Sequence, residues 1–222
     1  SAEIASQLFD EMTAFASYAF NKSHAAAYGV VAVRTGWLKR HYPVQFFAAL
    51  LNSVSSDSGK VAAYSQYCRK HGIPLLPPDI NQSVRKFSVG RNAQGVSGIR
   101  FGLGAIKSCK AIDSIIAQRR KGGPYKDIFD FCQRMDSEQV NKRVVESLIL
   151  SGAMDCTGAR RTQLMAVYES ALDGAAKSRR SNVAGQMSLF GDGLLEEVKP
   201  TLPDIPEYNL RTMLSLEKNV TG

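Results

Sequence analysis

Apolar residues recur at helical spacing through the first third of the chain. Ile4, Leu8, Met12 and Phe15 lie three or four positions apart, which predicts an amphipathic helix. We expect three more helices after it: one from near Ser23 to His41, one over "PVQFFAALLNS", and one that follows "SSDSG" and stops at Gly72. This part of the sequence therefore predicts an all-helical region.

The pattern changes after Gly72. "GIPLLPPDINQS" has prolines at positions 74, 77 and 78, so we expect an extended connector. "RKFSVG" and "SGIRFGLG" are strand candidates separated by a Gly- and Asn-rich turn, which predicts a small β-hairpin. Three helices are expected next, marked by apolar faces around Ile112, Val144 and Leu164. From about Lys177 the periodicity fades, and only "RTMLSLEKNVTG" predicts a further helix. The expected fold is mainly α, with one β-hairpin and a flexible C-terminal linker.

Composition narrows the class of protein. The 222 residues are 44% hydrophobic and 22% charged, as in ordinary globular proteins. No apolar run approaches the roughly 20 residues of a membrane span, and no signal sequence is recognisable. The four cysteines are far apart and the three histidines lack metal-ligand spacing. These features predict a cytoplasmic protein with reduced thiols, no membrane partner, no metal site and no cofactor of its own.

The net charge of +8 is unevenly distributed. Basic residues exceed acidic ones by three in residues 1–70, by five in 71–155 and by three in 156–181, whereas acidic residues exceed basic ones by three in 182–222. A basic body often binds nucleic acid, although a solvated surface gives the same count.

The stretch "FNKSHAAAY" is the first candidate site. Asn21, Lys22, Ser23 and His24 place a cation, a hydroxyl and an imidazole at an expected helix start, where free N–H groups and the helix dipole favour an anion such as phosphate. The alternative is an ordinary helix cap with a solvated lysine.

Two helical hairpins form the second candidate. "FGLGAIKSCKAIDSIIAQRR" predicts a tight turn between two helices, and "NKRVVESLILSGAMD" followed by "GARRTQLM" repeats the arrangement. Helix-hairpin-helix motifs hold the DNA backbone through main-chain N–H groups and nearby cations, without reading bases. The alternative is a pair of hairpins that only build a core. The candidate DNA contacts are Lys107, Ser108, Lys110, Arg119, Arg143, Arg160 and Arg161.

A short apolar segment inside the expected linker is the third candidate. In "GQMSLFGD", Gln186, Leu189 and Phe190 form a QxxLF pattern with Met187 and Ser188 as spacers. Short linear motifs dock in this way, with apolar anchors in a partner's pocket and a polar side chain fixing the register. The alternative is a loop that packs these side chains on its own domain.

Several catalytic classes find no support. The sequence shows no closely spaced carboxylate pair for two-metal phosphoryl transfer, no P-loop, no dinucleotide fingerprint and no Ser-His-Asp or Cys-His arrangement. No catalytic residue is therefore assigned.

Taken together, these stretches resemble one family. "FDEMTAFASYAFNKSHAAAYGVVAVRTGWLKRHYPVQFFAALLNS" is similar to the fingers of the C-family replicative polymerases, the bacterial DNA polymerase III alpha subunits. "GIPLLPPDINQS", "IRFGLGAIK", "GGPYKDIFDFCQR" and "NKRVVESLILSGAMD" continue the match in order. "QMSLFGD" stands where that family keeps its internal motif for the sliding clamp.

The resemblance implies an excised piece of such a polymerase. We expect the end of the fingers in residues 1–72, tandem helix-hairpin-helix motifs in 73–176 and a clamp-binding linker in 177–222. The palm, with its catalytic aspartates and Mg²⁺, would lie upstream of Ser1, so the piece alone should be inactive. The implied partners are duplex DNA, the sliding clamp and the remaining polymerase domains, and "FNKSH" would lie near the incoming nucleotide and template.

One departure from the family concerns the first hairpin. The family usually has "KGVG" after "GLGAI", whereas this chain has Lys107, Ser108, Cys109 and Lys110. Losing both glycines puts the phosphate-cradling geometry in doubt, because positive φ is costly for Ser and Lys. Two alternatives stay open. One is a stand-alone helix-hairpin-helix DNA-binding accessory protein, although such a protein would not need "FNKSH" or the long hydrophobic fingers helices. The other, which the lost glycines keep open, is an adaptor that binds the clamp and not DNA.

Overall fold

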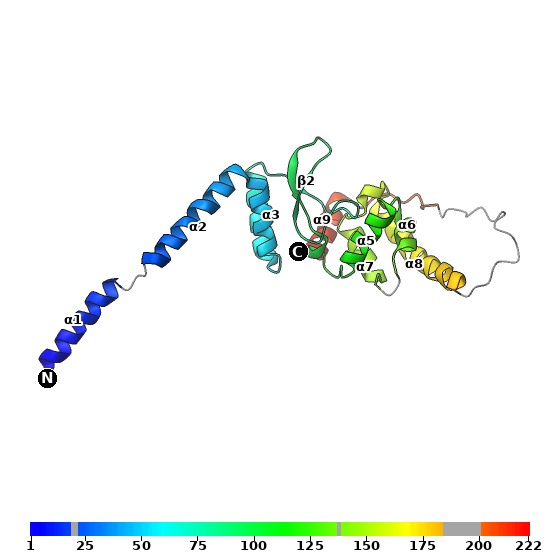
Figure 1. Ribbon diagram of the computed structural model, residues 1–222. Helices are drawn as coiled ribbons and strands as arrows, with labels where there is room; N and C mark the ends of the chain where they lie inside the picture. The colour runs from blue at the N-terminus through cyan, green and yellow to red at the C-terminus, as the bar shows by residue number, and fades with distance from the viewer. Residues whose placement is uncertain (19–21, 137–138, 184–200) are drawn as a thin grey trace, which may run out of the picture. The chain divides into compact units, whose positions relative to one another are not determined.

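The computed structural model describes residues 1–18, 22–136, 139–183 and 201–222. Within these ranges the fold is mainly helical with one small sheet, as the sequence predicts (Figure 1). Contacts divide the chain into two compact units, residues 1–46 and 47–222. The sequence-based boundaries near residues 72 and 176 stay predictions about domain organisation. No helix in the described ranges is both long and apolar enough to cross a membrane.

The first unit consists of α1 (Ala2–Tyr18), α2 (Lys22–His41) and the start of α3 (Pro43–Ser53). The expected apolar stripe of α1 is present, but its side chains are solvent-exposed: Phe15 is 75% exposed and Met12 is 69% exposed. Trp37 on α2 is 51% exposed. Within the described residues, these helices therefore carry apolar surface that their own unit does not cover.

The second unit begins with the buried face of α3 and continues into α4 (Ser58–Lys70). Asp57 caps α4, since its carboxylate accepts the Lys60 N–H at 3.0 Å. The Asn52 amide exchanges two 2.8 Å hydrogen bonds with the Phe87 backbone, donating to its C=O and accepting its N–H. This pair ties α3 to the start of the sheet.

The sheet has three strands in the order β1-β3-β2. Their bounds are β1 (Leu75–Leu76), β2 (Ser88–Arg91) and β3 (Ser97–Arg100). The predicted hairpin is confirmed, because β2 runs antiparallel to β3 with Val89 opposite Ile99. The central β3 also pairs in parallel with β1, which lies inside the proline-rich connector.

The next helices along the chain surround one apolar core. They are α5 (Ile112–Gly122), α6 (Ile128–Arg134), α7 (Lys142–Leu150) and α8 (Arg161–Val183), with single 3₁₀ turns η1 (Leu103–Ala105) and η2 (Asp155–Thr157). α8 packs against α6 and α7. Ile115, Phe131, Val145 and Leu148 are completely buried between these helices.

The connector is bound to this core by polar side chains. Asn81 accepts the Tyr125 N–H at 2.7 Å and donates to the Tyr125 C=O at 2.9 Å. Arg119 donates to the carbonyls of Ile80 and Ser83 at 2.7 and 2.9 Å. These bonds satisfy backbone groups that the irregular connector would otherwise leave unpaired.

Two helical features were not predicted. α6 lies in "KDIFDFCQR", and its seven residues are too few to show a clear period. α8 continues past Lys177 to Val183, and Arg179 in this stretch donates to the Met135 carbonyl. The Asp127 cap and packing on α8 account for α6, and a tertiary contact accounts for the end of α8.

Candidate nucleic-acid interface

The first hairpin joins η1 to α5. Gly102 stands at the start of this hairpin, just before η1. It has no room for a side chain, because a Cβ there would lie 2.5 Å from the Lys86 carbonyl carbon. Ile106 and Cys109 point into the core, whereas Lys107 and Lys110 are exposed. The first arm is one 3₁₀ turn, so the expected pair of helices is corrected here to a turn followed by a helix.

Ser108 supplies the left-handed residue of this hairpin. Its φ is +66°, and among the described residues it is the one non-glycine with positive φ. Lys110 donates its N–H to the Ser108 carbonyl at 3.0 Å. The turn therefore has positive φ at the first lost glycine, at a cost of about 1–2 kcal/mol. The second lost position, Lys110, has no positive φ.

The second hairpin follows α7. Asn141 caps that helix by accepting the Val144 N–H at 3.1 Å. The helix ends at Leu150 and is followed by Gly152, whose φ is +79°. A Cβ at Gly152 would lie 2.4 Å from the Arg161 guanidinium. Glycine therefore provides both the turn and the space for Arg161, the first residue of α8.

The Arg161 side chain is buried between acidic partners and is not exposed to solvent. Its side chain is 5% exposed, with 2.9 and 2.7 Å hydrogen bonds to Asp155 and a 2.8 Å contact to Glu217. Burial by itself would lower the pKa of Arg161, but the hydrogen bonds and charges of Asp155 and Glu217 raise it. The guanidinium is thus a permanently charged link between the hairpin and the last helix, α9 (Leu210–Thr221).

The C-terminal end of α9 contacts the first hairpin. Lys107 donates its N–H to the Val220 carbonyl at 2.8 Å and its ammonium to the Asn219 carbonyl at 2.9 Å. A cation at a helix C-terminus is favoured by the helix dipole and satisfies carbonyls that lack helical partners. Because Glu217 and Val220 lie within one turn, α9 brings Lys107 and Arg161 to the same side of the fold.

The segment before α9 contacts the start of α8. The Glu207 carboxylate accepts the N–H groups of Arg161 at 2.7 Å and Thr162 at 3.4 Å. Burial would raise the pKa of Glu207, but the N–H groups of Tyr208, Arg161 and Thr162 lower it overall. Arg160 makes a 3.0 Å ion pair with Asp204. Acidic groups therefore occupy the N-terminal end of α8.

The other predicted site residues are spread over the molecule. Arg143 is exposed in the first turn of α7, whereas Arg119 donates hydrogen bonds to carbonyls of the connector. Lys22, Ser23 and His24 are exposed in the first turn of α2. Asn21 and the five positions of the QxxLF segment, Gln186 to Phe190, lie outside the described residues.

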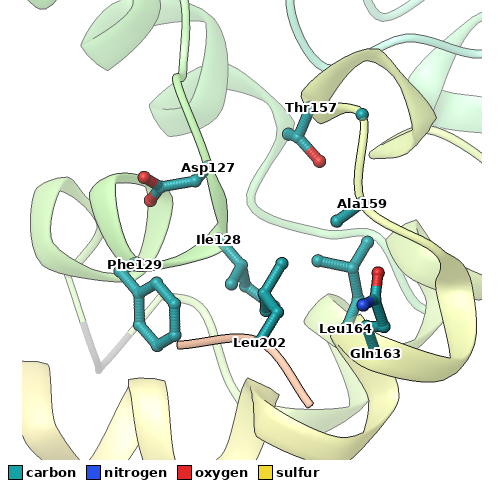
Figure 2. Close-up of a pocket in the computed structure, with 9 residues that line it drawn as sticks. Asp127, Ile128, Phe129, Thr157, Ala159, Gln163, Leu164 and Leu202 are labelled. Atoms are coloured by element: carbon teal, nitrogen blue, oxygen red, sulfur yellow. The ribbon is translucent and has the colours of Figure 1, made fainter. Parts of the chain in front are cut away.

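A pocket of about 190 Å³ lies beside the second hairpin, between the starts of α6 and α8. Figure 2 shows Ile128, Leu164 and Leu202 among its lining side chains, while the Asp127 carboxylate points away from them. That carboxylate accepts the Asp130 N–H at 2.8 Å as the cap of α6. The pocket wall thus includes Leu202, from the same segment that carries Asp204 and Glu207. No group of three potential metal ligands is found among the described residues.

No sequence pattern indicated the acidic residues that contact the hairpins. Asp204, Glu207 and Glu217 belong to the stretch whose acidic excess was noted. That excess was the available signal, but a charge count does not identify which basic groups the carboxylates reach.

Comparisons with known proteins agree with the motifs. A family described as "Helix-hairpin-helix motif" matches residues 72–164. The DNA polymerase III subunit alpha of Vibrio cholerae is 40% identical over 99% of the chain, and that of Thermus aquaticus is 43% identical over 99%. The Escherichia coli K12 subunit is 41% identical over 86% of the chain. The chain spans 19%, 17% and 16% of these three relatives, respectively.

Proposed function

This chain belongs by sequence to the family of DNA polymerase III alpha subunits, and we propose that it serves such a polymerase in two ways. It holds duplex DNA without reading its sequence, and it tethers the polymerase to the sliding clamp. The helix-hairpin-helix match over residues 72–164 carries the first role. The QxxLF segment carries the second.

The DNA-holding role is supported by the first hairpin. Its left-handed turn at Ser108 lies next to Lys110, which is exposed, while Cys109 anchors the turn in the core. Exposed cations beside a turn suit phosphate oxygens, which carry no sequence information. Arg143 and the half-exposed Arg160 extend the basic surface to the second hairpin.

The clamp-tethering role rests on sequence. Leu189 and Phe190 are large apolar residues in a stretch rich in Gly, Ser and Asp, and Gln186 supplies a polar anchor. Such a segment gains by burying its apolar side chains on a partner. Met187 and Ser188 act as spacers.

Nucleotide incorporation is assigned here to the complete polymerase and not to this chain alone. Nucleotidyl transfer uses two metal ions about 3.5–4 Å apart, held by carboxylates, and this sequence shows no suitable pair. The chain by itself is therefore expected to be inactive. The exposed apolar faces of α1 and α2 suit the remaining polymerase domains as partners, with Asn21, Lys22, Ser23 and His24 near the nucleotide and template.

A salt titration of duplex binding tests the first role. Affinity should fall steeply with salt, and Lys110→Ala should lower the log–log slope by about 0.9 for one lost phosphate contact. Lys70→Ala, an exposed lysine on α4, is the matched control and should leave the slope unchanged. Duplex affinity that does not change with salt concentration, or equal salt slopes for the two variants, would contradict the role given to the first hairpin.

A paired double substitution tests the second role. Leu189→Ala with Phe190→Ala should weaken binding to a purified bacterial sliding clamp by roughly 30-fold or more, as loss of deep anchors does. Leu194→Ala with Leu195→Ala removes the same kind of apolar bulk from the same stretch and should bind normally. Unchanged clamp affinity in the first variant, or a large fall in its melting temperature, would count against tethering.

A further inference from the structure

We propose that residues 203–221 act as an internal competitor for DNA: they occupy the donors that would otherwise bind backbone phosphates. This inference rests on the proposed DNA-holding function. We call the shared groups the donor surface, and they are the Lys107 N–H and ammonium, the Arg160 and Arg161 guanidiniums, and the first N–H groups of α8.

Each part of the donor surface already has an acceptor from this segment. Asn219 and Val220 carbonyls take the two donors of Lys107. Glu217 takes Arg161, at 2.8 Å. The remaining acceptors serve the start of α8: Asp204 and the Ile205 carbonyl for Arg160, the Glu207 carboxylate for the N–H groups of Arg161 and Thr162, and the Pro203 carbonyl for Gln163.

These acceptors offer the same chemistry as a phosphodiester. Carboxylates, like phosphate oxygens, accept charge-assisted hydrogen bonds from guanidinium, ammonium and helix N-terminal N–H groups. The Glu207 carboxylate satisfies these donors incompletely. It lies 3.4 Å from the Thr162 N–H, and the buried Thr162 hydroxyl oxygen finds no hydrogen-bond partner among the described residues. The two non-bridging oxygens of a phosphodiester are strong acceptors for these same groups.

The segment is held in a way that permits release. None of the residues of α9 is buried, and its contacts to Lys107 and Arg161 are hydrogen bonds and an ion pair. The Asp204 side chain is 97% exposed in its ion pair with Arg160. Exposed ion pairs are weak and readily exchange partners. Duplex DNA and the segment compete for the single backbone N–H of Lys107 and the first N–H groups of α8, so binding of one favours release of the other.

Charge-neutral substitutions test the competition. Glu207→Gln with Glu217→Gln weakens the internal acceptors, and duplex affinity should rise about threefold or more at low salt. Glu146→Gln with Asp173→Asn removes two acidic charges elsewhere on α7 and α8, which controls for net charge. The rise should be clearly larger for the first variant than for the control.

The other outcomes are equally informative. Equal affinities for the two variants would overturn the inference while leaving DNA binding intact. A fall in affinity in the first variant would show that the segment supports the hairpins instead of competing. Absence of duplex binding in the parent and both variants would overturn the proposed function together with the inference.

Hydrogen exchange on the unmodified chain gives a second test that does not depend on variants. Saturating duplex should speed amide exchange in residues 210–221, because α9 leaves the donor surface. Residues 128–134 of α6 lie in the core and should not change, so they serve as the internal reference. Slower or unchanged exchange in α9 with bound DNA would overturn the proposal.

Discussion

The guanidinium of Arg161 lies 2.8 Å from the carboxylate of Glu217, and this contact joins the start of α8 to α9. Asp155 binds the same guanidinium through two hydrogen bonds, at 2.9 and 2.7 Å. A residue expected to contact DNA is thus almost completely buried between two acidic side chains. The C-terminal segment is consequently part of the hairpin structure and not merely a linker that follows it.

Removal of the Arg161 side chain should destabilise the chain. Arg161→Ala leaves Asp155 and Glu217 without their shared cation, and we expect the free energy of unfolding to fall by about 2 kcal/mol. This is less than for a fully buried pair, because both carboxylates are partly exposed. Urea denaturation measures the change. Arg143→Ala, at an exposed position, should change stability by less than about 0.5 kcal/mol, and equal losses in both variants would contradict the assignment.

Glycine at position 108 should stabilise the first hairpin. The native φ of +66° strains serine but not glycine, so we expect Ser108→Gly to raise the free energy of unfolding by about 1 kcal/mol. Lys110→Gly is the matched control, since Lys110 has no positive φ, and it should give no such gain. Chemical denaturation of the two variants side by side would show the difference. A loss of stability in Ser108→Gly would mean that the hydroxyl contributes more than the strain costs.

The hydrogen bonds of the Glu207 carboxylate to the start of α8 should weaken at acid pH. Its pKa is lowered from 4.5 in the folded chain, so its contribution to stability is present above about pH 4.5 and is lost as pH falls through the lowered pKa. NMR shifts of the Arg161 and Thr162 amides should report this titration. In Glu207→Gln the acid-dependent shift at these two amides should disappear, and its persistence would assign it to another group.

Two thiols should be unreactive in the folded chain. Burial raises the pKa of the Cys109 thiol to about 11. Burial is also the largest effect on the Cys132 thiol, whose pKa is raised to about 12. Because the thiolate is the reactive form, neither should be modified quickly by a thiol reagent at pH 8. Peptide mapping after timed labelling measures each site, and denaturant should release both. Fast labelling of Cys132 in the native chain would contradict its position in the core.

The sequence predicted the elements whose cause is local. The spacing of Ile4, Leu8, Met12 and Phe15 predicted α1, and Pro43 marked the start of α3, as the structure confirms. Turn residues between two alternating stretches predicted the β2–β3 hairpin. The family was also predicted, from motifs in a fixed order, and relatives 40% and 43% identical to the chain confirm it.

The sequence left open the features that depend on distant partners. No apolar period indicated α6, whose seven residues are capped locally by Asp127 but pack on α8, a helix distant in the sequence. Positive φ at Ser108 required a fold that anchors Ile106 and Cys109 on either side of the turn. Local chemistry disfavours that conformation, so only the surrounding contacts decide it.

The candidate site also has some features that the sequence determined and others that only the tertiary structure decided. The sequence by itself determined which residues carry charge: it identified Lys107, Arg160 and Arg161 as basic groups at two hairpins, and an acidic excess near the C-terminus. Only the tertiary structure decided that these groups meet, since Asn219 lies 112 positions from Lys107 and Glu207 lies 46 positions from Arg161. Hydrogen bonds and ion pairs act over a few ångströms, so their partners are set by how the chain folds back on itself and not by spacing along it.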